Sequence, residues 1–121
     1  TVLKPGEILT SIRLPKAWAG ARYYFEKVSD RETWDFPLVN IALAMFVKGG
    51  KIQRVRISCG GVQCVPRRLI GVEDLLTGEA INEELATMGG SSASRGAKAL
   101  NFNHFKVPLM ENLVIRAIRN S

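Results

Sequence analysis

Apolar and polar residues alternate with a period of two through the first half of the chain, and this pattern predicts β-strands. The predicted strands cover residues 6–15, 22–29, 38–47 and 52–58. The run at 38–47 is apolar at almost every position, so we expect a central strand that is covered on both faces. Between the last two strands, "KGGK" predicts a hairpin loop, because Gly49 and Gly50 adopt positive φ at little cost.

The strand at 52–58 carries an irregularity in its pattern. Ile52, Val55 and Ile57 do not all share one parity, so they cannot all face the core of a regular strand. One extra residue in the strand would restore a common face, and we therefore expect a β-bulge.

The period changes to that of a helix after Pro66. In "PRRLIGVEDLLTGE" the apolar face consists of Leu69, Val72, Leu75 and Leu76. Pro66 suits the first turn of this helix, and Gly78 suits the position just after its end. Asn82 is the expected N-cap of a second helix, "EELATMGG".

The remaining sequence predicts a connection and one more helix. "GGSSASRGAKALN" is small and polar, which favours a loop or a short exposed helix. Residues 103–120 repeat apolar side chains at helical spacing, and Pro108 suits only the first turn. Strands first and helices afterwards indicate the α+β class. We expect one domain, 1–121, with an antiparallel sheet of three to four strands followed by about three helices packed on one face.

The net charge of +6 and the pI of about 9.8 leave three interpretations open: nucleic acid, an acidic partner or anionic cofactor, and a merely basic surface. Lysine and arginine are dispersed, so we do not expect nucleic-acid binding. No apolar run approaches the ~20 residues that cross a bilayer, and we expect no membrane partner. Cys59 and Cys64 are expected as reduced thiols, with a local disulfide as the alternative; two thiols cannot close a zinc site.

The sequence lacks the motifs of a self-contained active site. It has no dinucleotide fingerprint, no phosphate-binding loop, no nucleophile elbow and no zinc-protease motif. His104 is the single histidine and has no evident nucleophile or acid beside it. We therefore predict no catalytic residues and no metal ligands within the chain.

Four stretches in series resemble the C-terminal domain of the FAD-binding subunits of molybdenum hydroxylases, which include xanthine dehydrogenases, aldehyde oxidoreductases and carbon monoxide dehydrogenases. The stretches are "LKPGEILTSIRLP", "YYFEKVSDRETWDFPLVNIALAM", "IQRVRISCGGVQCVPRRLIGVEDLLTGE" and "NFNHFKVPLMENLVIRAI". In that family FAD lies mainly on N-terminal subdomains that this chain does not contain. The resemblance implies that FAD belongs to the intact subunit and is not bound by this fragment alone.

The resemblance also implies a wall beside the flavin ring, built from the strand that contains Lys27 and from the loop after it. Lys27 and Arg31 would supply positive charge to the reduced ring. Trp34 would cover a ring edge, and Asp35 would orient one of the cations. Solvated strand-edge charges are the alternative for the two cations, and a core position is the alternative for Trp34.

The predicted function is electron transfer from iron–sulfur centres to FAD, as part of a xanthine dehydrogenase-like or aldehyde oxidoreductase-like enzyme. The alternative is a non-catalytic basic module that docks an acidic partner. Molybdenum cofactor and iron–sulfur clusters are expected on partner subunits or domains, and the whole complex is a candidate homo-oligomer. We expect a fragment or a processed subunit, in the cytoplasm, or in the periplasm if the complex is exported.

Overall fold

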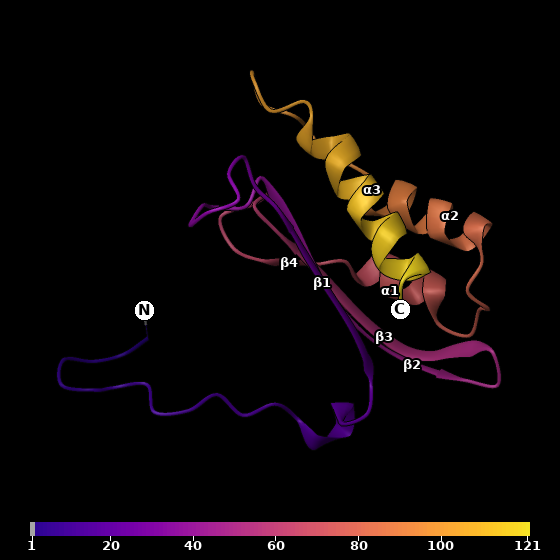
Figure 1. The fold of residues 1–121 in the computed structure, drawn as a ribbon, viewed down its shortest axis with the longest axis horizontal. Coiled ribbons are helices and arrows are strands. Elements are labelled where there is room, and N and C mark those ends of the chain that lie inside the picture. Colours follow the sequence, from indigo (N-terminus) through magenta and orange to yellow (C-terminus); the bar gives the residue numbers. More distant parts are fainter. Residues whose placement is uncertain (1) are drawn as a thin grey trace.

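The centre of the structure is a long hairpin of β2 (Val39–Lys48) and β3 (Lys51–Gly60). The structure is a computed structural model that describes residues 2–121. β1 (Arg22–Val28) pairs with β2, and the short β4 (Arg67–Arg68) pairs with β3. All pairings are antiparallel, in the order β1-β2-β3-β4 (Figure 1). The predicted α+β class and the strand count are confirmed.

Both predicted irregularities of the hairpin are present. Gly49 and Gly50 form the turn with φ values of 62° and 75°. The register shifts where Phe46 pairs with Arg54 but Val47 pairs with Ile52, so Gln53 is the extra residue. This bulge turns Ile52 and Val55 to the same face, and both are buried.

Three helices cover one face of the sheet: α1 (Ile70–Leu76), α2 (Glu83–Ala93) and α3 (Lys106–Arg119) (Figure 1). The core lies between the two layers. Its largest fully buried side chains are Ile41, Met45, Ile52, Ile57, Leu76, Leu113 and Ile118. Helix α3 crosses β2 and contacts α2 along its length, and α1 lies against β3.

The opposite face of the sheet, which we call the outer face, is covered by no α-helix within the described residues. It carries Tyr23, Phe25, Ala42, Ala44, Phe46, Arg54, Arg56 and Ser58. Tyr23 and Phe25 are 62% and 65% exposed. The prediction that 38–47 is covered on both faces is therefore wrong for this chain, because α1, α2 and α3 all follow the sheet and pack on the same side.

The predicted helix bounds need two corrections. Pro66 does not begin a helix, because Arg67 and Arg68 extend the sheet as β4 and the backbone N–H of Leu69 donates to Ile57. Helix α2 continues past the predicted "EELATMGG" to Ala93, and Gly89 and Gly90 within it allow close contact with α3. The predictions for Gly78 and Asn82 are confirmed: Gly78 has a φ of 92°, and Asn82 caps α2 through the N–H of Leu85.

The predicted strand at 6–15 is wrong for the structure as described. Residues 7–14 have no β partner among residues 2–121 and run in an extended path away from the sheet (Figure 1). The alternating pattern identifies a segment that suits a strand, but it does not supply the neighbouring strand that must complete the hydrogen bonds.

Candidate functional site

The loop between β1 and β2 brings three of the four predicted site residues together. Lys27 lies near the end of β1, and its Nζ donates to the backbone oxygen of Asp35 at 2.7 Å. Arg31 donates to the Asp35 carboxylate from Nη2 at 3.1 Å and from Nε at 3.3 Å. The N–H of Phe36 donates to the same carboxylate at 2.9 Å. Asp35 therefore closes the loop by holding both cations.

The electrostatics of this cluster leave it positively charged. The hydrogen bonds from Arg31 hold the pKa of Asp35 below its usual value, and the nearby Lys27 contributes in the same direction. Asp35 is consequently ionised at neutral pH and offsets the charge of Arg31. Among residues 2–121, no carboxylate forms an ion pair with Lys27, whose ammonium contacts a neutral carbonyl. Lys27, Arg31 and Asp35 together carry one positive charge in excess, in a loop that also carries Asp30 and Glu32.

Trp34 does not join the cluster. Its side chain is 97% exposed, and the neighbouring Phe36 is 88% exposed. The alternative that placed Trp34 in the core is therefore wrong. A large aromatic side chain on a loop tip is available to a surface that approaches the loop from outside.

A hollow of about 390 Å³ lies on the outer face at the same end of the sheet. Its lining includes Phe25, Asn40, Ser58, Gly60 and Cys64. Lys27 pairs in register with Asn40, and Asn40 pairs with Gly60, so one row across the sheet joins the charged cluster to the hollow. Ligand pockets begin at about 300 Å³, so the hollow can accept part of a ring system.

Two glycines give the hollow its shape. A Cβ on Gly60 would lie 2.3 Å from Oδ1 of Asn40, and a Cβ on Gly61 would lie 2.8 Å from the backbone oxygen of Leu38. Gly61 also has a φ of 78°, which side chains rarely adopt. The sequence pattern did not predict this hollow.

The other candidate chemistry is limited. Both thiols are free: Cys59 is buried beside Met110, and burial raises the pKa of its thiol, whereas Cys64 is exposed. The alternative of a local disulfide is therefore wrong.

Within residues 2–121, no group of three His, Cys, Asp or Glu side chains could hold a metal ion. No helix in the same range is long and apolar enough to span a bilayer.

Comparison with known proteins places the charged cluster and the hollow in a defined domain. Residues 23–121 match the model of the CO dehydrogenase flavoprotein C-terminal domain. This chain belongs to that family. The match begins inside β1, so this flavoprotein C-terminal domain contains Lys27, the loop and the hollow, whereas residues 7–14 precede it.

Two curated relatives of the flavoprotein domain are medium subunits. The chain is 34% identical over 80 residues to the glyceraldehyde dehydrogenase medium chain of Sulfolobus acidocaldarius, covering 66% of this chain and 28% of that protein. It is 26% identical over 121 residues to the nicotine 6-hydroxylase medium subunit of Paenarthrobacter nicotinovorans, covering 100% of this chain and 42% of that protein. The chain thus spans less than half of either relative.

Solved structures share the fold. Quinoline 2-oxidoreductase from Pseudomonas putida 86 superposes with a TM-score of 0.76 at 23% identity, covering 84% of this chain and 36% of that chain. Carbon monoxide dehydrogenase from Hydrogenophaga pseudoflava superposes with a TM-score of 0.75 at 24% identity, with the same coverage. None of these relatives supports the alternative of a basic module that docks an acidic partner.

Proposed function

We propose that this domain walls the flavin in the FAD-binding subunit of a molybdenum hydroxylase, at the point where electrons from iron–sulfur centres reach FAD. The family is defined by a flavoprotein, and the solved structures that share the fold include a Cu,Mo-CO dehydrogenase. The observation that carries the proposal is the ammonium of Lys27, which Asp35 holds at the edge of a hollow on the outer face.

The residues present fit a flavin that is held by another part of the protein. A bound FAD accepts and releases electrons, and its ring carries negative charge near N1 and the C2 carbonyl when reduced. Lys27 would stabilise that charge from one side, because within residues 2–121 its ammonium donates to a neutral carbonyl and forms no ion pair with a carboxylate. Phe25, 65% exposed beside the hollow, supplies an apolar ring surface.

The other loop residues would have supporting roles. Asp35 would position Lys27 through its backbone oxygen and Arg31 through its carboxylate. Arg31, whose side chain is 69% exposed, would add a second and better screened positive charge. Trp34 would cover an edge of the ring or of the domain that holds it.

The proposal extends to the assembly. Molybdenum cofactor and iron–sulfur clusters would lie on partner subunits or domains, and the intact complex is a candidate homo-oligomer. A cytoplasmic location agrees with the free, exposed thiol of Cys64, because a reducing compartment keeps exposed thiols unpaired. The hydroxylated substrate would be determined by the molybdenum-binding partner and not by this domain.

Amide hydrogen exchange of the full-length subunit, with and without FAD, tests the proposal. FAD is expected to slow exchange in residues 27–36 and in the glycine segment at 60–61. The hairpin turn at Gly49 and Gly50 lies at the other end of β2 and serves as the internal control. Equal exchange of 27–36 with and without bound FAD would contradict the flavin wall.

A further inference from the structure

The segment before β1 exposes hydrophobic side chains that nothing in the described chain covers. We call residues 7–14 the arm. Ile8, Ile12 and Leu14 are 83%, 80% and 82% exposed, and Leu9 on the opposite side is 64% exposed. Ile8, Ile12 and Leu14 share one parity, so an extended arm presents them on one side. Such a stripe is typical of a strand with one buried face.

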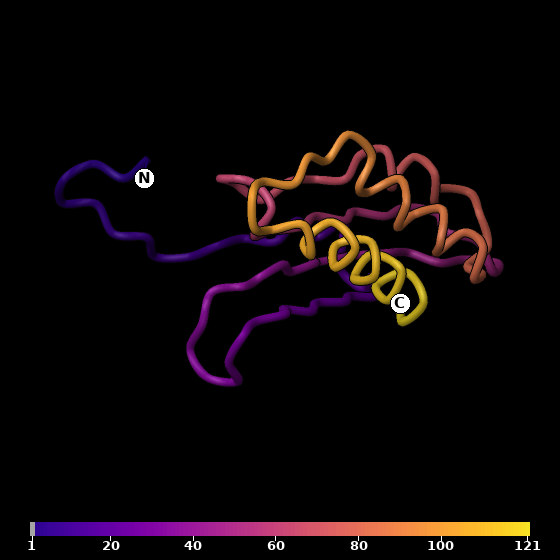
Figure 2. Tube along the Cα trace, turned by 90° about the horizontal axis from the view of Figure 1, so that it is seen from above, coloured from indigo at the N-terminus to yellow at the C-terminus, as the bar shows by residue number. Residues whose placement is uncertain are grey.

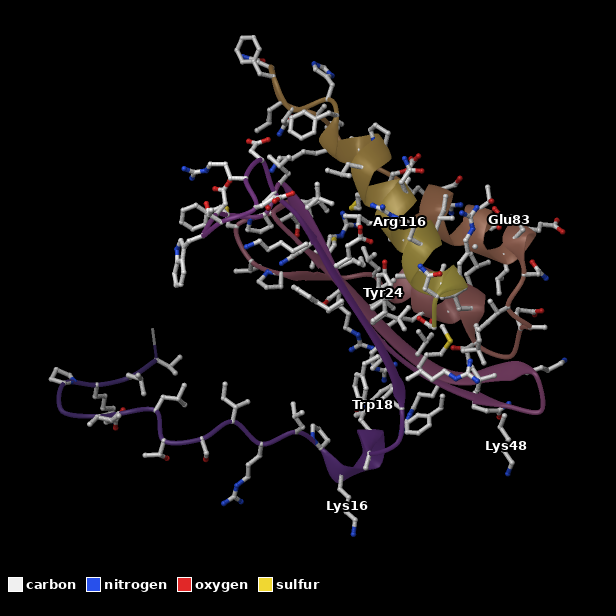
Figure 3. All side chains as sticks on the ribbon, viewed as in Figure 1. Lys16, Trp18, Tyr24, Lys48, Glu83 and Arg116 are labelled. Atoms are coloured by element: carbon white, nitrogen blue, oxygen red, sulfur yellow. The ribbon has the colours of Figure 1, made fainter. Side chains whose placement is uncertain are left out.

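The root of the arm is fixed and is not a frayed end. Trp18, in the short helix η1 (Lys16–Trp18), stacks on Phe46 with ring centroids 5.7 Å apart (Figure 3). The Arg54 guanidinium lies 4.2 Å from the Trp18 ring centroid, and Arg54 also donates to the backbone oxygen of Ala17. The hydroxyl of Tyr23 donates to the backbone oxygen of Trp18 at 2.6 Å. These contacts attach η1 to the outer face and hold in place the C-terminal end of the arm, which leads into η1.

We propose that the arm is a β-strand that pairs with an open sheet edge in the flavin-holding part of the same polypeptide. Strand addition uses two properties that the arm has. From Ile8 to Leu14 its backbone N–H and C=O groups make no hydrogen bond to other backbone groups of the described residues, and alternate side chains supply an apolar face. The side chains of Ile8, Ile12 and Leu14 would then pack against the hydrophobic core of the flavin-holding part.

Two observations favour this occupant. The family domain begins at residue 23, so the arm lies outside it, yet the nicotine 6-hydroxylase subunit aligns through all 121 residues. That alignment covers 42% of the relative, so the other 58% lies beyond it and can hold the receiving sheet. The identity of this part as flavin-holding rests on the proposed function.

The direction of the arm agrees with this occupant. The arm and the β1–β2 loop project from the sheet toward the same side of the molecule (Figures 1 and 2). One neighbouring body could therefore contact both the arm and the Lys27 cluster. A second copy of this chain is the other occupant, and the variants below distinguish it from the flavin-holding part.

Hydrogen exchange of the arm in the full-length subunit tests the pairing. Amides in residues 8–13 are expected to exchange at least about a hundredfold more slowly than unstructured amides, as ladder amides in strands do. Exchange at the unstructured rate would overturn the inference. A protected arm in a subunit that binds no FAD would support the pairing while contradicting the proposed function.

A pair of variants identifies the occupant. Ile12→Asn should lower the melting temperature of the full-length subunit by several degrees, because a polar amide would enter the buried face. Leu100→Asn is the matched control, since Leu100 is 72% exposed and lies within the family domain; it should leave the melting temperature unchanged. An unchanged melting temperature for Ile12→Asn overturns the inference. Self-association that Ile12→Asn abolishes also overturns it, because a second copy would then receive the arm.

Discussion

Arg31 and Asp35 form a two-bond ion pair within the β1–β2 loop, with N–O distances of 3.1 and 3.3 Å. The same aspartate accepts from the N–H of Phe36 and, through its backbone oxygen, from Lys27. Asp35 therefore holds both predicted flavin-facing cations, Arg31 in the loop and Lys27 near the end of β1.

Asp35→Asn should disorder this loop without unfolding the domain. The amide keeps the size of the side chain but loses the charge that holds Arg31. Backbone exchange at Phe36 should accelerate, while exchange in β2 stays unchanged. Because the pKa of Asp35 is lowered, the wild-type loop should keep its order on acidification to about pH 4 and lose it only below that value. Loss of loop order near pH 6 would contradict the role of Asp35.

The buried carboxylate of Glu73 should contribute stability that depends on pH. Burial alone would raise its pKa, but hydrogen bonds from Arg68 and from the N–H of Ile57 outweigh burial and lower the pKa. As the pH falls, Glu73 therefore becomes protonated at a higher pH in the unfolded chain than in the folded chain. The free energy of unfolding should decrease from about pH 5 downward, through the pKa of the folded state.

Glu73→Gln measures this contribution. The variant should lose about 1–3 kcal/mol at neutral pH, because a charged acceptor of several hydrogen bonds is removed. Its stability should also depend less on pH below about pH 5 than that of the wild type. Glu84→Gln on the exposed face of α2 is the control. Equal pH profiles for the wild type and Glu73→Gln, from chemical denaturation, would show that Glu73 carries no such linkage.

Gly90→Ala should destabilise the packing of α2 on α3. A Cβ at residue 90 would lie 3.0 Å from the backbone oxygen of Glu111 and 2.8 Å from Cγ1 of Ile115. A backbone atom cannot move aside cheaply, so we expect a loss of about 1–3 kcal/mol. Gly71→Ala in α1 is the control: its nearest neighbour would be Oγ of Ser92 at 3.8 Å, and alanine should leave stability unchanged or raise it. A tolerated Gly90→Ala in thermal unfolding would show that the helices can separate.

Leu113→Ala should cost about 2–5 kcal/mol, because the side chain is fully buried between α3 and the sheet. Leu109→Ala, one turn earlier, should cost less, because Leu109 is only partly buried. Denaturant titration of the two variants measures the free energy of unfolding that each substitution removes. Equal losses would mean that the face of α3 that packs inward is assigned wrongly.

The three strands between residues 22 and 60 and the helix caps at Gly78 and Asn82 follow from the sequence because their determinants are local. Gly49 and Gly50 fix a turn, and Asn82 caps a helix through a neighbour three residues away. The bulge at Gln53 follows from a parity conflict along a single strand. Each of these features needs only its own neighbourhood.

The failures concern features that depend on distant partners. The arm has the pattern of a strand, but the pattern says nothing of where its partner lies. The apolar pattern of residues 38–47 predicts a strand that is covered on both faces, yet the α-helices cover only one face of this strand. Pro66 suits a helix start, but Arg68 is drawn into the sheet and bonds Glu73. The hollow arises from side chains that are missing at Gly60 and Gly61, and an apolar pattern does not report missing atoms.

The redox potential of FAD in the full-length subunit tests most directly whether Lys27 faces the flavin. Lys27→Met keeps much of the side-chain stem and removes the charge. The potential should fall by tens of millivolts, since a nearby positive charge favours the anionic reduced ring and screening leaves only part of its effect. Arg31→Met should lower it less, and Lys48→Met, at the far end of β2, should not change it. An unchanged potential in Lys27→Met with FAD fully bound would contradict the flavin wall and place Lys27 among solvated surface charges.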